Sequence, residues 1–217
     1  MKKSKRSDVD PFIVMDVMEA ARIAEENGKH IIHMEVGQPG TPAPKIARDF
    51  ITNEINKNNL GYTVSLGLPN LRKKISNLYG DWYKIDVNPN RIVVTTGSSG
   101  AFILSFSALF DSGDRVGIGS PSYPSYRQIL KSLSLETVDI QTKLENRFQP
   151  VPEDIINNNL NGILVASPAN PTGSMLDKQS LKNLINTAND NNVSFISDEI
   201  YHGIQYKNNP TSALEIT

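Results

Sequence analysis

Short apolar segments alternate with helical segments from residue 90 onward, and this alternation constrains the fold more than any other feature of the sequence. Each apolar segment is rich in β-branched residues, which favours a strand, and most are followed by a stretch with apolar positions at helical spacing. Strands are expected over 91–96, 115–119, 135–140, 162–167 and 193–197. Strands that alternate with helices in this way predict an α/β fold with a mostly parallel sheet.

The residues before this alternation are predicted to be mainly helical. Apolar residues three and four positions apart indicate helices over 10–26, 44–57 and 69–83. A short extended segment at 31–36 leads into a loop, 37–40, with the sequence GQPG.

The composition excludes several classes of function. The 22 Lys and Arg residues are balanced by 23 Asp and Glu, so the chain lacks the basic excess with which proteins bind nucleic acid. There is no cysteine, which excludes disulfides and thiolate zinc sites. No apolar run approaches the about 20 residues that span a bilayer, and no signal-peptide core follows the basic start. We therefore expect a cytoplasmic protein with no nucleic-acid partner and no membrane association.

Polar and glycine residues gather where the predicted strands end, the edge at which open α/β sheets bind ligands. Gly97, Ser98 and Ser99 follow the first strand and open a helix. Their backbone amides could hold a phosphate, or the segment could be a plain tight turn. Asp198 ends the fifth strand and could cap a helix, bind a metal or pair with a cationic ring nitrogen.

Several other polar and aromatic residues have equally simple structural interpretations. Tyr123 lies in a proline-rich loop and suits either core packing or stacking on a ligand. Asn170 precedes a proline and is typical of a turn. His30 and His33 have no carboxylate cluster nearby in the sequence and His202 is solitary, so no metal site is expected.

Together these motifs resemble those of the class I and II aminotransferases, which belong to the fold type I group of pyridoxal-phosphate enzymes. The resemblance begins near residue 10 and rests on six features in order: GQPG, Tyr62, TTGSSGAF, PSYPSY, SPANPTG and SDEIYHGI. It implies a three-layer α/β fold with a mostly parallel sheet. It also implies an N-terminal arm and helix over 1–40 and a large cofactor-binding domain over 41–217. This large domain is expected to be incomplete at its C-terminus, with the C-terminal small domain absent.

The resemblance further assigns residues to the cofactor phosphate and the substrate. Ser98, Ser99 and the amides after Gly97 would hold the phosphate of pyridoxal phosphate at the start of the following helix. Tyr62 would reach the phosphate of the neighbouring subunit, which implies a homodimer. Gly37 would approach the substrate carboxylate through its backbone.

Four more residues are assigned to the cofactor ring by the same resemblance. Tyr123 would stack on the pyridine ring, and Asp198 would pair with the ring nitrogen. Asn170 and Tyr201 would donate hydrogen bonds to the phenolic oxygen. At least one cis peptide bond is expected at two X-Pro positions where relatives often carry one: Ser120–Pro121 and Asn170–Pro171.

The sequence departs from the family pattern in lacking a recognisable Schiff-base lysine. That lysine follows the SDEIY segment at some distance in the family, so it is expected beyond Thr217, and no catalytic residue is assigned here. Lys178 and Lys182 fall on a helix that looks exposed, and Lys207 falls in a polar loop. The family's missing strands are expected to lie between those at 91–96 and 162–167, which would make the chain alone prone to aggregation.

The function implied is transfer of an amino group between an amino acid and a 2-oxo acid through pyridoxal phosphate, in amino acid metabolism. Two alternatives stay open. One is another fold type I reaction on an amino acid, such as that of a C–S lyase or a decarboxylase. The other is a catalytically inactive fragment that binds at most the cofactor or a partner chain. The phosphate loop and the ring aspartate do not distinguish these alternatives, and the substrate cannot be read from the sequence.

Overall fold

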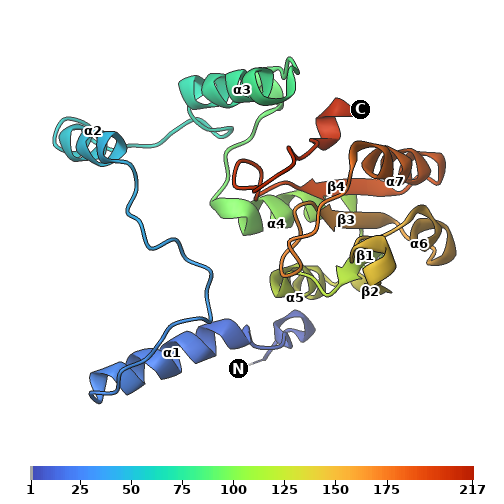
Figure 1. Ribbon diagram of the computed structural model, residues 1–217, viewed down its shortest axis with the longest axis horizontal. Helices are drawn as coiled ribbons and strands as arrows, with labels where there is room; N and C mark the ends of the chain where they lie inside the picture. Colours follow the sequence, from blue (N-terminus) through green and yellow to red (C-terminus); the bar gives the residue numbers. More distant parts are fainter. Residues whose placement is uncertain (1) are drawn as a thin grey trace. The chain divides into compact units, whose positions relative to one another are not determined.

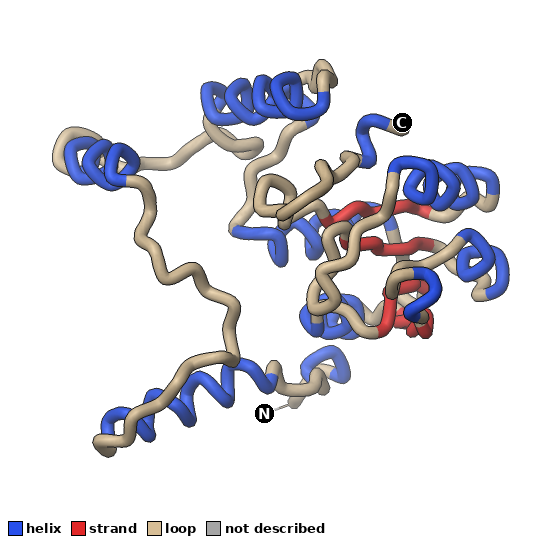
Figure 2. Tube along the Cα trace, viewed as in Figure 1, coloured by secondary structure: helices blue, strands red, loops and turns tan. Residues whose placement is uncertain are grey.

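The computed structural model describes residues 2–217, drawn as a ribbon in Figure 1 and as a tube in Figure 2. Its internal contacts divide the chain into two compact units. The larger unit combines the residues up to Asp10 with Pro69–Thr217, and the smaller unit is Pro11–Leu68. Among the described helices, none is long and apolar enough to cross a membrane.

The smaller unit contains two amphipathic helices, α1 (Ile13–Glu26) and α2 (Lys45–Ile55), joined by a long coil. Both helices were expected, and neither contains a buried residue. The predicted extended segment at 31–36 forms no strand, because no other strand within residues 2–217 runs beside it to complete a hydrogen-bonded ladder.

The larger unit is built on a four-stranded sheet in which every strand is parallel to its neighbours. The strands are β1 (Arg115–Ser120), β2 (Glu136–Gln141), β3 (Gly162–Ala166) and β4 (Ser194–Asp198). Their order in the sheet is β2-β1-β3-β4. The predicted parallel α/β sheet is therefore confirmed.

Helices cover both faces of this sheet and complete three layers (Figure 1). They are α4 (Gly97–Leu109) and α5 (Pro124–Ser132) on one face, and α6 (Pro152–Asn157) and α7 (Lys178–Asp190) on the other. Successive strand residues point to opposite faces, so β3 sends Leu164 to the first layer and Ile163 and Val165 to the second. Two apolar cores result, one on each side of the sheet. The first includes Phe102, Phe106, Val116, Ile118, Tyr126, Leu130, Leu135 and Leu164, and the second includes Ile140, Ile155, Leu160, Ile163, Val165, Leu184, Ala188 and Val193.

The expectation of a strand over 91–96 was wrong. This β-branched segment is extended coil in the structure, because a strand forms only beside a ladder partner and none of the described strands adjoins it. Among the described strands, β3 pairs directly with β4, so β4 is the edge strand on that side. That the family's further strands lie between 91–96 and 162–167 stays a prediction.

The helix α3 (Pro69–Tyr83) also belongs to the larger unit and leads into the coil before α4. The buried Arg72 guanidinium donates to the Pro89 carbonyl at 2.9 Å, which ties the helix to this coil. The expectation of a cis bond was confirmed at both predicted positions. A third cis bond, not expected, lies between Ser167 and Pro168, and the three are Ser120–Pro121, Ser167–Pro168 and Asn170–Pro171.

Candidate functional site

Asp198 is the last residue of β4, and its carboxylate is almost fully enclosed at the carboxyl edge of the sheet. The phenol of Tyr126, itself buried in α5, donates a short hydrogen bond to one carboxylate oxygen. The other oxygen accepts the backbone N–H of Ile200 at 3.1 Å. Burial raises the pKa of the Tyr126 phenol, and the Asp198 carboxylate raises it further, so the phenol keeps its proton and acts as the donor. The structure thus holds a buried anion in a fixed orientation.

Asn170 and Tyr201 come together from the loops that follow β3 and β4. The amide Nδ2 of Asn170 donates to the Tyr201 hydroxyl oxygen at 3.1 Å. The same two loops are joined at their bases, where the Ser167 backbone N–H donates to the Asp198 carbonyl at 3.1 Å. The sequence placed Asn170 after one predicted strand and Asp198 and Tyr201 at the end of another, and the parallel pairing of β3 with β4 brings these two strand ends to one edge.

Gly97, Ser98 and Ser99 form the first turn of α4, as predicted. Gly97 has a φ of +73°, a conformation that glycine adopts without strain. The residue before it, Thr96, provides no side-chain cap for the helix. The first amides of α4 therefore lie at the positive end of a helix dipole without a side-chain acceptor from the capping position, which suits an anion such as phosphate.

Aromatic contacts connect this helix terminus with Asp198. Phe102, one turn into α4, meets the Tyr126 ring edge-on, with 5.2 Å between the ring centres. Tyr123 meets the Tyr126 ring from the loop after β1, at 5.4 Å and 80°. Tyr126 is thus in contact with the helix predicted to bind the phosphate, with the predicted stacking residue and with the predicted partner of the ring nitrogen.

These groups fit the parts of pyridoxal phosphate. A buried carboxylate with a fixed orientation suits a protonated ring nitrogen, and a donor pair formed by an amide and a phenol suits a phenolic oxygen. The uncapped start of α4 suits the phosphate. A small cavity at this edge, about 20 Å³ in volume, is lined by Tyr126 and Asn170 among others. The residues present are therefore chemically suited to the cofactor.

The two remaining predicted residues lie in the smaller unit. Gly37 and Tyr62 are both in coil, and the Tyr62 side chain is fully exposed. Their assignment to substrate and to a neighbouring subunit's phosphate stays a prediction. In the same unit, the His33 ring contacts two carboxylates, with Nδ1 2.6 Å from Glu35 and Nε2 3.0 Å from Glu25. Both carboxylates hold the pKa of His33 above its ordinary value, Glu35 having the larger effect.

The lysines near the end of the chain lie on exposed surfaces. Lys178 and Lys182 are exposed on α7, and Lys207 is exposed in the coil after β4. Lys178 Nζ is 3.2 Å from the Glu215 carboxylate. None of these three lysines makes a described hydrogen bond or ion pair with Asp198, Asn170 or Tyr201.

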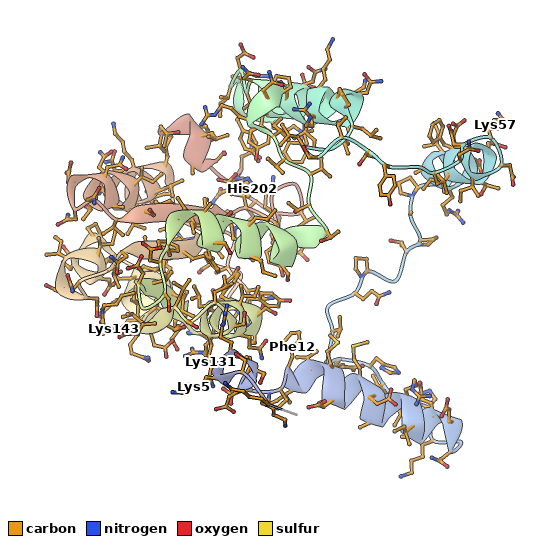
Figure 3. All side chains as sticks on the ribbon, turned by 180° about the vertical axis from the view of Figure 1, so that it is seen from behind. Lys5, Phe12, Lys57, Lys131, Lys143 and His202 are labelled. Atoms are coloured by element: carbon orange, nitrogen blue, oxygen red, sulfur yellow. The ribbon has the colours of Figure 1, made fainter. Side chains whose placement is uncertain are left out.

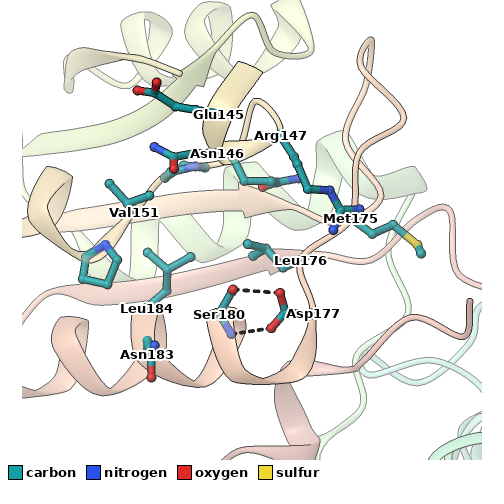
Figure 4. A pocket seen from close by; sticks show the side chains of 13 residues that line it. Glu145, Asn146, Arg147, Val151, Met175, Leu176, Asp177, Ser180, Asn183 and Leu184 are labelled. Carbon is teal, nitrogen blue, oxygen red and sulfur yellow. Dashed lines mark hydrogen bonds between the residues drawn. The ribbon is translucent and has the colours of Figure 1, made fainter. Parts of the chain in front are cut away.

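A larger cavity of about 270 Å³ lies apart from these residues, between the loop before α6 and the start of α7 (Figure 4). Its lining includes Glu145, Arg147 and Asp177, and none of the predicted cofactor residues. In Figure 4, two dashed lines join the Asp177 carboxylate to the backbone N–H and the hydroxyl of Ser180, both at 2.9 Å. Asp177 is therefore the N-cap of α7, and its role here is structural.

The sequence reasoning missed three residues that the structure adds to the site: Tyr126, His202 and Tyr83. The sequence could have indicated that Tyr126 is buried, because it lies three residues after Tyr123 and four before Leu130 on one helical face. A buried tyrosine needs a hydrogen-bond partner for its hydroxyl. His202 and Tyr83 are separated by 119 positions, and nothing in the local sequence of either indicates the other.

Comparison with known proteins shows the family to which the chain belongs. The family model for aminotransferase class I and II matches residues 29–216. A valine–pyruvate aminotransferase of Mycobacterium tuberculosis is 41% identical over 210 residues, which cover 96% of this chain and 54% of that protein. An aspartate aminotransferase of Thermotoga maritima is 31% identical over 97% of this chain and 57% of its own length. The crystal structure of an aminotransferase from M. tuberculosis, 39% identical, superposes with a TM-score of 0.94 over all of this chain and 57% of its own. The chain thus spans about half the length of the curated relatives it matches.

Proposed function

The chain belongs to the class I and II aminotransferases, a family of pyridoxal-phosphate enzymes, and on that premise we propose that it is the N-terminal, cofactor-holding portion of such an enzyme. The complete protein would move an amino group between an amino acid and a 2-oxo acid, as a cytoplasmic homodimer. Residues 1–40 would form its arm, and residues 41–217 most of its large domain. The observation that carries the proposal is the buried Asp198 carboxylate, held by Tyr126 beside the loop pair of Asn170 and Tyr201.

Each residue of the site has a defined task in this proposal. Asp198 would accept a hydrogen bond from the ring nitrogen and keep it protonated, and Tyr126 holds the carboxylate in place for that contact. Asn170 and Tyr201 donate to the phenolic oxygen, and Tyr123 stacks on the ring. The bound cofactor supplies a cationic ring that withdraws the electron pair released when the Cα–H bond of an amino acid breaks.

The phosphate and substrate contacts complete the assignment. Ser98 and Ser99, with the amides that follow Gly97, would hold the phosphate at the start of α4. Tyr62 adds a contact to the phosphate of the partner subunit, and Gly37 meets the substrate carboxylate through its backbone. Proton transfer at Cα is assigned to a lysine beyond Thr217, because Lys178, Lys182 and Lys207 are all exposed.

Borohydride reduction in the presence of pyridoxal phosphate tests this assignment. Peptide mass mapping of the treated chain should find no single lysine labelled in preference to the others, and the chain alone should show no transaminase turnover. One preferentially labelled site at Lys178, Lys182 or Lys207 would contradict the assignment.

A second assay tests the reaction itself. A form of the protein extended through the segment that its longer relatives carry should exchange amino groups in a panel of amino acids and 2-oxo acids. Release of a thiol or of carbon dioxide without amino transfer would instead indicate a lyase or a decarboxylase.

A further inference from the structure

The side chain of His202 is enclosed between the end of β3 and helix α3, in the turn that follows β4 (Figure 3). Only 5% of the side chain is exposed. Its Nε2 lies 2.9 Å from the Ser167 carbonyl oxygen, and its Nδ1 lies 2.5 Å from the Tyr83 hydroxyl oxygen. One imidazole therefore joins three segments that are far apart in the sequence.

The partners determine which nitrogen carries the proton in the neutral ring. A carbonyl oxygen can only accept, so Nε2 must donate to Ser167, and Nδ1 must then accept from the Tyr83 hydroxyl. Burial, with a smaller effect from the Glu199 carboxylate, raises the pKa of Tyr83 to about 12, so the hydroxyl retains its proton near neutral pH. Glu199 itself is 3.8 Å from Nδ1 and accepts hydrogen bonds from the Ser212 hydroxyl and the Ala213 amide.

Among the described residues, the bond from His202 to Ser167 is one of three that connect the loop after β3 with the end of β4 and the turn that follows it. The others are Ser167 N–H to the Asp198 carbonyl and the Asn170 amide to the Tyr201 hydroxyl. Asn170 and Tyr201 sit on short irregular segments, whose positions are fixed by such cross-links rather than by a ladder.

The turn is also held against α3 by close packing. Gly203 has a φ of +93°, and a Cβ at this position would lie 2.7 Å from the Trp82 ring. The Tyr83 ring lies 5.7 Å from the imidazole, centre to centre. Helix α3 thus supplies both a hydrogen-bond donor and an aromatic surface to the turn that carries Tyr201.

We propose that His202 is a positioning residue, which acts in its Nε2–H form to hold Asn170 and Tyr201 where they can donate to the phenolic oxygen of the cofactor. This inference rests on the proposed function, since it assumes that Asn170 and Tyr201 face pyridoxal phosphate. His202 itself touches neither cofactor nor substrate in this proposal, and it works through the two loops.

The first test needs no cofactor. Nitrogen-15 NMR of the full chain, recorded where the imidazole is neutral, should show His202 as the Nε2–H tautomer. Tyr83→Phe should shift the Nδ1 resonance, because it removes the donor to that nitrogen. An Nδ1–H tautomer, or an unchanged Nδ1 resonance in Tyr83→Phe, would overturn the proposal.

The second test asks whether the histidine positions the two loops. His202→Leu removes both bonds, whereas His202→Gln keeps one donor and one acceptor on a side chain of similar reach. The side-chain amide resonances of Asn170 should move in the Leu variant and return toward wild type in the Gln variant. The exposed His30→Gln serves as the matched control. Unchanged Asn170 resonances in His202→Leu would overturn the proposal, and Tyr83→Phe provides the milder perturbation if the Leu variant does not fold.

The third test uses pyridoxal phosphate and its absorption spectrum. The pH midpoint for ionisation of the bound phenol should rise by about 0.5–1 unit in His202→Leu and recover in His202→Gln, as expected for weakened donation to a charged oxygen. Equal midpoints in all variants would overturn the positioning role. If the wild-type chain binds no pyridoxal phosphate, the proposed function fails, and the two NMR tests still decide whether His202 fixes the loops.

Discussion

Replacement of Tyr126 by phenylalanine removes one hydroxyl from the centre of the site and leaves the ring in place. The Tyr126 side chain is 3% exposed, and its hydroxyl donates to a carboxylate in a residue that is 7% exposed. Because phenylalanine preserves the ring contacts with Phe102 and Tyr123, the change isolates the hydrogen bond. Asp198 would keep the Ile200 N–H as its remaining described partner.

The expected loss follows from burial and charge. A hydrogen bond to a charged group contributes about 1.5–3 kcal/mol, and little water can replace the lost donor at this depth. Tyr126→Phe should therefore lower the free energy of unfolding by about 1.5–3 kcal/mol, a large fraction of a domain stability of about 5–15 kcal/mol. In a double-mutant cycle with Asp198→Ala, the coupling energy should be about 1–3 kcal/mol.

Urea unfolding measures both quantities, with far-UV circular dichroism and the fluorescence of the single tryptophan, Trp82, as independent probes. The protein concentration should be kept below the onset of light scattering. Tyr206→Phe is the matched control, since Tyr206 is fully exposed and should change stability by less than about 0.5 kcal/mol. A loss in Tyr126→Phe no larger than in this control, with a coupling energy near zero, would show that this hydrogen bond does not stabilise the fold.

Three further predictions concern other parts of the chain. Asp177→Ala removes the N-cap of α7 and should lower the free energy of unfolding in urea by about 1 kcal/mol. The Ser180 backbone N–H lowers the pKa of Asp177, so the cap stabilises the helix fully above the ordinary pKa of about 3.9 and loses this effect as the pH falls through the lowered pKa. A loss of stability in Asp177→Ala that does not vary with pH in this range would argue against the cap. In NMR, the titration midpoint of His33 should lie above the ordinary histidine pKa, and Glu35→Gln should lower this midpoint. The ion pairs of His33 with Glu25 and Glu35 are complete below about pH 6.5 and weaken as the pH rises through the raised pKa. Equal midpoints in the wild type and in Glu35→Gln would contradict the contact between His33 and Glu35. Leu104, on α4, is 57% exposed and lies beside Ile103, which is also apolar. Leu104→Lys should therefore reduce self-association measured by light scattering. Unchanged scattering would show that the chain does not self-associate through this face of α4.

The sequence identified the elements whose pattern is local. Gly162–Ala166 could be recognised as a strand because a buried run of β-branched and aliphatic residues lies between turn residues, and the structure pairs it on both sides. Segment 91–96 has a similar composition and is not a strand, because strand formation depends on a partner that local sequence does not describe.

In the candidate site too, residues with a local sequence pattern could be identified and contacts between distant elements could not. Asp198 and Asn170 could be singled out by their places after predicted strands, since parallel strands bring their carboxyl ends to one edge. The contacts of Tyr126 with Asp198 and of Tyr83 with His202 join elements 72 and 119 residues apart. Such contacts are set by how the layers pack, so the local sequence could indicate that Tyr126 is buried but could not identify the partner of either tyrosine.

A binding titration of pyridoxal phosphate against the full chain and two aspartate variants tests directly whether this edge of the sheet holds the cofactor. We expect saturable binding of one equivalent per chain. Asp198→Ala should weaken it at least about tenfold, because loss of a hydrogen bond between charged groups exceeds about 1.4 kcal/mol. Asp190→Ala, an exposed position at the end of α7, should bind like the wild type. Absence of saturable binding by the wild type, or equal affinity in Asp198→Ala, would contradict the claim that this edge of the sheet holds the cofactor.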